Sequence, residues 1–178
     1  MKIVSRQNPF QKRPVRLSVD LMLFLVLAIL LLPSGKGIAG EKITIGEVEE
    51  VVLMPWGLRL PARIDTGAAT SSLDARELNV ENNIAEFRLP KKFGNLQLHL
   101  PVVEWQSIRS ADFAERRPVV EITLCMGSKL IRAQVTLNDR SRVSYPLIIG
   151  RNILKDNFVV DCTRSNCSPP KCPEVPSR

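Results

Sequence analysis

The chain has 178 residues, a formal net charge of +7 and a single histidine. Residues 1–39 contain six basic residues and one acidic residue, so this segment supplies +5 of the charge and leaves about +2 for the remainder. The charge surplus therefore belongs to the N-terminal segment. Because no basic stripe interleaved with aromatic residues follows it, we exclude a nucleic-acid-binding role.

Residues 1–39 have the layout of an export signal. Lys2 and Arg16 bound a basic region, residues 21–32 form an apolar run of twelve, and Gly37-Ile38-Ala39 places small residues at a cleavage site. Twelve residues are short for a membrane span, which needs about 20. The segment is read as a signal peptide cleaved near Ala39 or as an uncleaved signal anchor. We expect export to the periplasm or cell surface, with a possible inner-membrane tether through residues 21–32.

The following residues, up to 161, are predicted to form one all-β domain with one short C-terminal helix. Short apolar or alternating runs are separated by turn residues at regular intervals, which is typical of a small closed β-barrel or sandwich. Strands are expected at 43–53, 58–64, 85–89, 96–100, 119–125, 130–137, 145–150 and 158–161, with the helix at 151–156. The domain is assigned to residues 40–161, and residues 162–178 form a Cys/Pro-rich tail.

Four cysteines lie after the export signal, at positions 125, 162, 167 and 172. In an exported protein they predict disulfides, and the three possible full pairings all stay open. A zinc site is disfavoured, because four residues separate successive tail cysteines and the only histidine, His99, is far away in sequence. No metal and no cofactor are expected.

One triplet, Asp65-Thr66-Gly67, ends the predicted strand 58–64 and is followed by small residues. A strand that delivers a carboxylate into a tight glycine-containing turn is the local arrangement that acid proteolysis needs. About eighty residues later, Ile148-Ile149-Gly150 precedes the short helix. In aspartic peptidases, which this pair of motifs resembles, the corresponding strand packs beside the loop and buries its polar turn, and the same is expected here.

On these motifs the chain resembles the retropepsins, and more closely the bacterial retropepsin-like proteins often labelled "ATP-dependent zinc protease". The matching stretches are 62–75, 117–120, 135–140 and 145–151. The resemblance implies a retropepsin-like acid-protease barrel and an aspartic endopeptidase without ATP or zinc, since the chain has no His-Glu-x-x-His motif and no phosphate loop. It also implies catalytic roles for Asp65, Thr66 and Gly67, and a supporting role for five residues: Ala68, Ile148, Ile149, Gly150 and Arg151.

The chain departs from the family pattern at two positions. Viral members carry an Asp two residues after the loop glycine, where this chain has Ala69, so Arg151 needs another partner and Asp74 and Asp139 are the candidates. Bacterial members often have His before the alanine that ends the loop motif, and here Asp74 precedes Ala75. Both departures are compatible with a degenerate enzyme as well as with an active one.

A single Asp-Thr-Gly triplet implies a homodimer, because peptide hydrolysis by this chemistry needs two carboxylates that share a proton. The second Asp65 would come from a two-fold mate, and the partner in the site would be a peptide or protein substrate. The segment 83–117, with Trp105, is expected to be the flap over the site or, alternatively, a surface hairpin. Two other functions remain open: a non-catalytic module that binds peptides by strand addition, and a membrane-tethered interaction protein.

Overall fold

The computed structural model describes residues 41–109 and 114–172, and these form a mainly β domain with one short α-helix. The expected export signal, residues 1–39, lies outside the described residues. In the described part of the chain, no helix has the length and apolar character needed to cross a membrane. The elements in chain order are β1 (Ile43–Ile45), β2 (Val48–Met54), β3 (Leu58–Ile64), β4 (Ser71–Asp74), β5 (Arg76–Glu81), β6 (Ile84–Arg88), the 3-10 turn η1 (Lys91–Phe93), β7 (Gln97–Arg109), β8 (Ala114–Met126), β9 (Lys129–Asn138), β10 (Leu147–Ile149), α2 (Arg151–Asn157) and β11 (Phe158–Val160).

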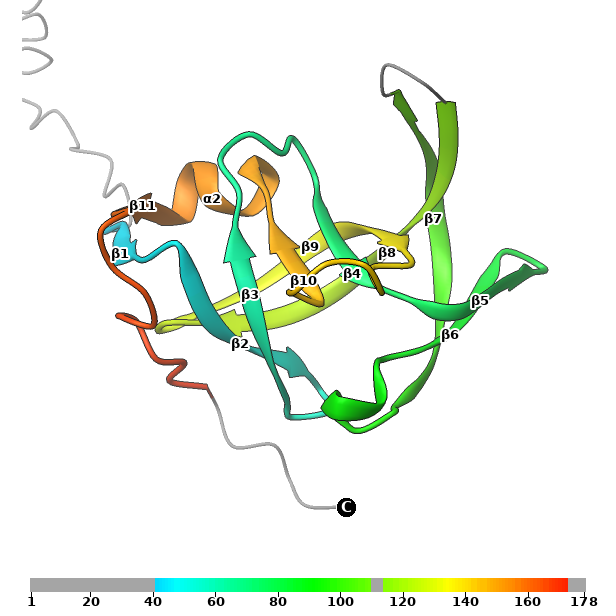
Figure 1. Ribbon diagram of the computed structural model, residues 1–178, viewed down its shortest axis with the longest axis horizontal. Coiled ribbons are helices and arrows are strands. Elements are labelled where there is room, and N and C mark those ends of the chain that lie inside the picture. The colour runs from blue at the N-terminus through cyan, green and yellow to red at the C-terminus, as the bar shows by residue number, and fades with distance from the viewer. Residues whose placement is uncertain (1–40, 110–113, 173–178) are drawn as a thin grey trace, which may run out of the picture. The chain divides into compact units, whose positions relative to one another are not determined.

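Six strands close into a barrel (Figure 1). The sheet order runs β2-β3-β10-β4-β9-β8, and β8 pairs again with β2. Because the sheet closes on itself, each of these six strands pairs with a neighbour on both sides. Closure removes exposed strand edges, which are a common route to aggregation. The predicted fold class, a small closed all-β barrel with one short helix near the C-terminus, is confirmed.

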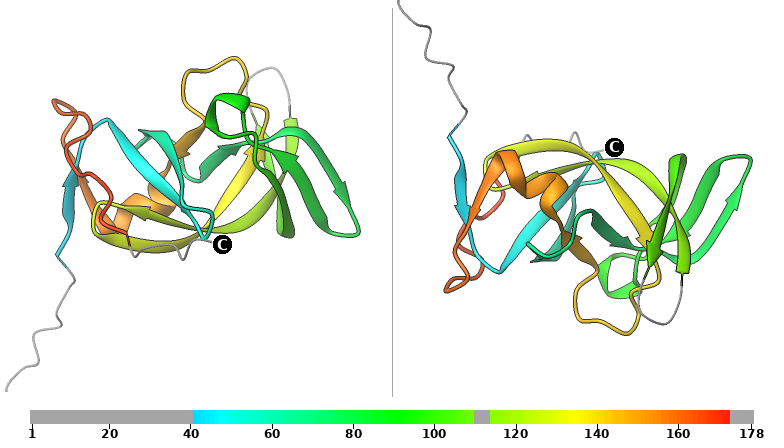
Figure 2. Two further views of the ribbon diagram at one scale, coloured as in Figure 1. Left: turned by 90° about the horizontal axis from the view of Figure 1, so that it is seen from below. Right: turned by 90° about the horizontal axis from the view of Figure 1, so that it is seen from above.

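The remaining long strands extend the sheet beyond the barrel. β7, β6 and β5 continue from β8 in antiparallel pairs, and the β5–β6 hairpin projects away from the barrel on the side opposite β1 and β11 (Figure 2). Asn82 and Asn83 form its turn with positive φ angles of 48° and 62°, as expected for a type I′ hairpin turn. The predicted hairpin 85–89/96–100 corresponds to the β6–β7 pair.

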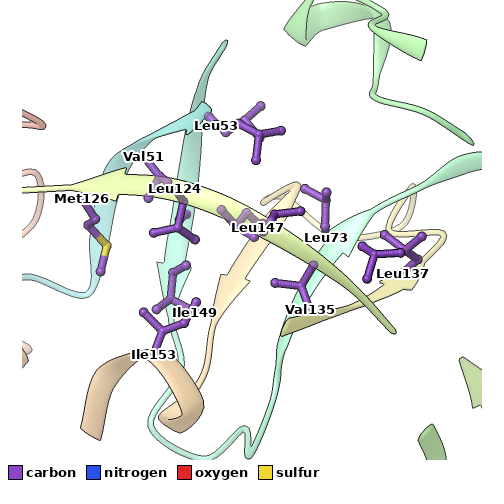
Figure 3. Close-up of a cluster of buried hydrophobic side chains, with 14 of the residues drawn as sticks. Val51, Leu53, Leu73, Leu124, Met126, Val135, Leu137, Leu147, Ile149 and Ile153 are labelled. Carbon is purple, nitrogen blue, oxygen red and sulfur yellow. The ribbon is translucent and has the colours of Figure 1, made fainter. Parts of the chain in front are cut away.

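The barrel interior is filled by aliphatic side chains from all six strands and from α2 (Figure 3). In β3 the buried residues Leu60, Ala62 and Ile64 alternate with Arg59 and Arg63, so period-two patterning directs one face inward. Burying each large aliphatic side chain contributes roughly 1.5–3 kcal/mol. The core members labelled in the figure are Val51, Leu53, Leu73, Leu124, Met126, Val135, Leu137, Leu147, Ile149 and Ile153.

β10 is the short strand that determines the site. It lies between β3, to which it is parallel, and β4, to which it is antiparallel. Its two end residues, Leu147 and Ile149, are buried, and the chain turns directly into α2. The register pairs Ile149 with Ile64, the last residue before Asp65. The start of α2 is therefore carried to the loop that joins β3 and β4.

Two strands, β4 and β5, were not predicted. Ser71, Ser72 and Asp74 are polar, yet all of β4 is buried, so its sequence lacks the apolar signal of an inner strand. Two of these residues bond groups distant in sequence, Ser71 with Asn152 and Asp74 with the Arg140 N–H, whereas the Ser72 hydroxyl has no hydrogen-bond partner among the described residues. β5 alternates half-buried and exposed residues, but only one residue separates it from β4. Without a run of turn residues between the two strands, no sequence signal marked where β5 begins.

The tail after β11 packs back along the barrel. A disulfide joins Cys172 to Cys125 of β8, while Cys162 and Cys167 are free thiols. The side chain of Glu49, fully buried, accepts hydrogen bonds from the backbone N–H groups of Gly46, Cys167 and Ser168 at 2.6–3.2 Å. The Cys125–Cys172 disulfide thus ties the tail to the barrel and does not close a loop within the tail. The hydrogen bonds to Glu49 hold the tail to the barrel at a second place.

Candidate active site

Asp65 sits at the end of β3 in a hydrogen-bonded turn. Its Oδ1 accepts the backbone N–H groups of Gly67 at 2.9 Å and Ala68 at 3.1 Å. These bonds fix the carboxylate against its own loop, as short polar side chains commonly do in turns. Within the described part of the chain Oδ2 accepts no hydrogen bond, so this oxygen is free to meet water or a substrate.

The loop is held from behind by β10 and α2, as the sequence motifs predicted. The Asp65 N–H donates to Ile149 O at 3.0 Å, and the Arg151 N–H donates to Ala68 O at 2.9 Å. A Cβ placed on Gly150 would lie 2.8–3.0 Å from backbone atoms of residues 68–71. Only a residue without a side chain allows this approach. The two motifs are thus in direct backbone contact.

The Arg151 side chain fastens the same loop. Its Nη1 donates to Thr66 O at 3.0 Å and to Gly67 O at 2.7 Å. The expectation that Asp74 or Asp139 would be its partner is wrong. Both carboxylates bind Arg76 instead, at 2.7 Å and 3.3 Å, because β5 follows β4 directly and brings Arg76 next to them.

A network of hydrogen bonds that the sequence did not reveal joins the start of α2 to β4, the strand that follows the loop. Asn152 Oδ1 accepts both the N–H and the hydroxyl of buried Ser71, at 2.9 and 2.8 Å, and Asn152 Nδ2 donates to Gln134 O at 2.8 Å. The Ser71 Oγ in turn accepts the Gly150 N–H at 2.9 Å. Asn152, the second residue of α2, follows Gly150 and Arg151 in the sequence, but its partner Ser71 lies 81 residues away, so no local pattern indicated the bond.

The candidate flap strand reaches the segment that follows the Asp65-Thr66-Gly67 loop. Gln106 of β7 donates from Nε2 to Thr70 Oγ1 at 3.1 Å. Trp105, its neighbour, is 43% exposed and carries the Arg116 guanidinium 5.6 Å from its ring centroid. The tip of the expected flap, residues 110–113, lies outside the described residues, so the flap assignment stays a prediction.

Positive charge lies near the site. Arg140 follows β9, and burial lowers its pKa; the neighbouring carboxylate of Asp74, and more weakly that of Asp65, raise it, while Arg117 lowers it. Arg140 Nε donates to Tyr145 O at 3.1 Å. A recess of about 370 Å³ is lined by Arg117, Arg140 and Arg142 together with Glu115, Asn138, Asp139, Ser141 and Val143.

Metal-binding side chains do not gather in the described ranges, where no cluster of three or more His, Cys, Asp or Glu residues could hold an ion. The side chain of His99 on β7 is 56% exposed and lies beside Glu86 of the neighbouring strand β6. The described residues thus offer carboxylate, backbone and guanidinium groups for chemistry at Asp65.

Known proteins resemble the chain over nearly all of this domain. Residues 44–171 match the model of the RimB-like family, described as the retropepsin-like aspartic endopeptidase RimB. A probable alpha-L-glutamate ligase of Parasynechococcus marenigrum is 30% identical over 68% of the chain, and one of Shewanella pealeana is 26% identical over 71%. The chain spans less than a third of these relatives, 28% and 30% of their lengths.

A solved structure of similar size has the same fold. Lpg0085 of Legionella pneumophila, a protein of unknown function, superposes with a TM-score of 0.62 at 29% identity, covering 72% of this chain and 99% of its own. The family match includes the Asp-Thr-Gly loop, the start of α2 and Cys125, but it ends one residue before Cys172, the disulfide partner of Cys125. The chain belongs to the RimB-like family of retropepsin-like proteins.

Proposed function

We propose that the chain is an aspartic endopeptidase that works as a homodimer. The observation that carries the proposal is the Asp65 carboxylate, which the loop amides of Gly67 and Ala68 orient while leaving Oδ2 unbonded in the described part of the chain. The loop is fastened by Arg151 and by Ile149, so the carboxylate is held in place before any substrate arrives. Such preorganisation is what positions a reacting group for catalysis.

The chemistry needs two such carboxylates. One, ionised, takes a proton from a water molecule whose oxygen attacks the peptide carbonyl carbon, while the other, protonated, donates to the carbonyl oxygen. The C–N bond then breaks, and the nitrogen leaves as an amine after receiving a proton. Because the pair shares a single proton, we expect peptide cleavage at mildly acid pH.

The second carboxylate is assigned to a second copy of the chain. The sequence has one Asp-Thr-Gly triplet, so two Asp65 residues meet only if two copies face each other across a two-fold axis. The interface would be isologous and the site would lie on the axis. A monomer would carry half of the machinery.

Acidic peptides are the substrate class that this site favours. Arg140 is half-buried and lines one recess with Arg117 and Arg142. A guanidinium in such a position pairs well with a carboxylate side chain. The relatives named as probable alpha-L-glutamate ligases support the same direction, since the activity in their name concerns glutamate. Peptides with Glu near the scissile bond should be cleaved faster than matched Lys peptides, and the preference should weaken in salt.

Export is proposed from residues 1–39 and is compatible with the Cys125–Cys172 bridge, since disulfides persist in oxidising compartments. The mass of the protein recovered from the periplasm tests this directly. A mass that matches a chain beginning after Ala39 is expected for a cleaved signal, whereas the full-length mass in the membrane fraction would indicate an anchor.

The decisive variant is Asp65→Asn, tested on a mixed peptide library at mildly acid pH. Asp156→Asn, an exposed aspartate on α2, is the matched control. We expect cleavage by the wild type and by the control, and none by Asp65→Asn. Equal cleavage by all three proteins would remove Asp65 from the mechanism. Peptide binding without cleavage, unchanged by Asp65→Asn, would instead favour a non-catalytic binding module.

A further inference from the structure

Gln106 of β7 forms a side-chain hydrogen bond with the segment that follows the Asp65 loop. Its Nε2 donates to Thr70 Oγ1 at 3.1 Å, five residues after Asp65. The other end of the amide, Oε1, is shielded from solvent and has no hydrogen-bond partner among the described residues. Buried polar atoms are almost always paired in folded proteins, so an unpaired acceptor at this place needs a reason.

The alternation of side chains along β7 places the Gln106 side chain on the face of the strand that is turned toward Thr70. Side chains alternate along a strand, and Trp105 and Ser107, the neighbours of Gln106, are exposed. Gln106 therefore faces the opposite side, toward Thr70. Its cross-strand partner in β8 is Arg117, which lines the recess beside Arg140. Because Oε1 is shielded from solvent in this structure, a peptide bound between β7 and the Asp65 loop reaches it only by displacing the side chains that cover it.

We propose that Gln106 is a substrate-positioning residue whose Oε1 accepts a hydrogen bond from a main-chain N–H of the bound peptide. This inference rests on the proposed function and adds a specific contact to it. An amide oxygen accepts and never donates, so a carboxylate side chain cannot satisfy it, whereas the N–H that each residue other than proline carries can. The Thr70 bond holds the amide so that its oxygen stays directed at one position along the peptide.

The inference predicts that one substrate N–H matters far more than its neighbours. A series of peptides is made in which each N–H near the scissile bond is replaced, one at a time, by an ester oxygen. For the wild type, one replacement should lower kcat/KM by about tenfold or more, because the buried oxygen is then left unpaired. For Gln106→Met, which keeps the length of the side chain but lacks the acceptor, the same replacement should cost nothing further.

Two further variants make the comparison specific. Gln97→Met applies the same change to an exposed glutamine on the same strand, bonded to Glu86 and Arg88, and it should keep the wild-type ester profile. Gln106→Glu keeps an acceptor of the same length, which the Thr70 hydroxyl can bond, and it should also keep the sensitive position. Urea midpoints of all variants are compared, so that a folding defect is seen separately.

The outcomes separate the two proposals. Cleavage by the wild type with an ester profile that is unchanged in Gln106→Met would overturn the role of Gln106 and leave the endopeptidase intact. If no peptide is cleaved, the same ester series is titrated against the wild type and Gln106→Met by calorimetry. A position whose ester weakens binding only when Gln106 is present would support the contact without catalysis. Absence of any such position, or of any binding, would overturn it.

Discussion

Replacing Gly150 by alanine tests whether β10 and α2 support the catalytic loop. Gly150 has an extended backbone, with φ −92° and ψ −178°, so alanine meets no conformational barrier there. The added Cβ would lie 2.8 Å from Thr70 C, and 3.0 Å from both Ala68 O and Ser71 N. All three are backbone atoms that cannot rotate away. The loop itself must move by several tenths of an ångström.

The magnitude follows from this crowding. Overpacking of a well-packed site costs about 1–3 kcal/mol of unfolding free energy. The displaced loop also carries Asp65, whose N–H binds Ile149 O, and misplacement of a catalytic group by about 1 Å can lower the rate about a hundredfold. We therefore expect Gly150→Ala to lose both stability and nearly all peptidase activity.

Gly46→Ala is the matched control, because the backbone atoms that its Cβ crowds belong to the tail and not to the loop that carries Asp65. Its Cβ would lie 2.3 Å from Arg164 O and 2.8 Å from the Cα of Ser165, both in the tail. Stability should fall while kcat/KM stays near the wild-type value. Urea denaturation gives the unfolding free energies, and one peptide substrate gives the rates. Wild-type stability and activity in Gly150→Ala would refute the reasoning, as would an equal loss of activity in both variants.

Three further predictions concern other parts of the domain. Arg151→Met removes the two hydrogen bonds that this exposed side chain donates to the loop carbonyls. The unfolding free energy should change little, while kcat/KM should fall about ten- to hundredfold because the loop is no longer held in place. An unchanged kcat/KM would contradict the role of Arg151 in holding the loop. Glu49→Gln places an amide against three backbone N–H groups and should cost about 1–3 kcal/mol in urea denaturation, whereas an unchanged midpoint would contradict the role of the buried carboxylate. Burial and the neighbouring Glu49 raise the pKa of the Cys167 thiol, which lowers its thiolate fraction, so iodoacetamide should label exposed Cys162 first by mass spectrometry; faster labelling of Cys167 would contradict this.

The sequence was sufficient to predict that the Asp65 loop and the Ile148-Ile149-Gly150 motif pack together, because both carry a local signature. Asp65-Thr66-Gly67 ends an alternating strand, and Ile148-Ile149-Gly150 precedes a short helix. The bond from the Asp65 N–H to Ile149 O shows that the two motifs meet. Many short strands separated by turn residues indicated a small closed β-barrel or sandwich, and the resemblance to the retropepsins implied the barrel.

What could not be predicted depends on partners that are distant in the chain. β4 is polar in sequence but buried, because Asn152 and the Arg140 N–H satisfy Ser71 and Asp74. The partner of Arg151 is a pair of backbone carbonyls, which leave no trace in the identity of any residue. The pairing of Cys125 with Cys172 likewise requires knowing that the tail returns to β8.

Mixing the wild-type chain with Asp65→Asn tests most directly whether two copies form one site. The two proteins are combined in equal amounts, allowed to exchange subunits, and assayed at constant total protein concentration. If both Asp65 carboxylates of a two-fold pair are needed, only dimers of two wild-type chains are active, and the rate should fall to about a quarter of that of the pure wild type. A rate of about half, unchanged by exchange, would show that each chain acts alone and would contradict the shared site.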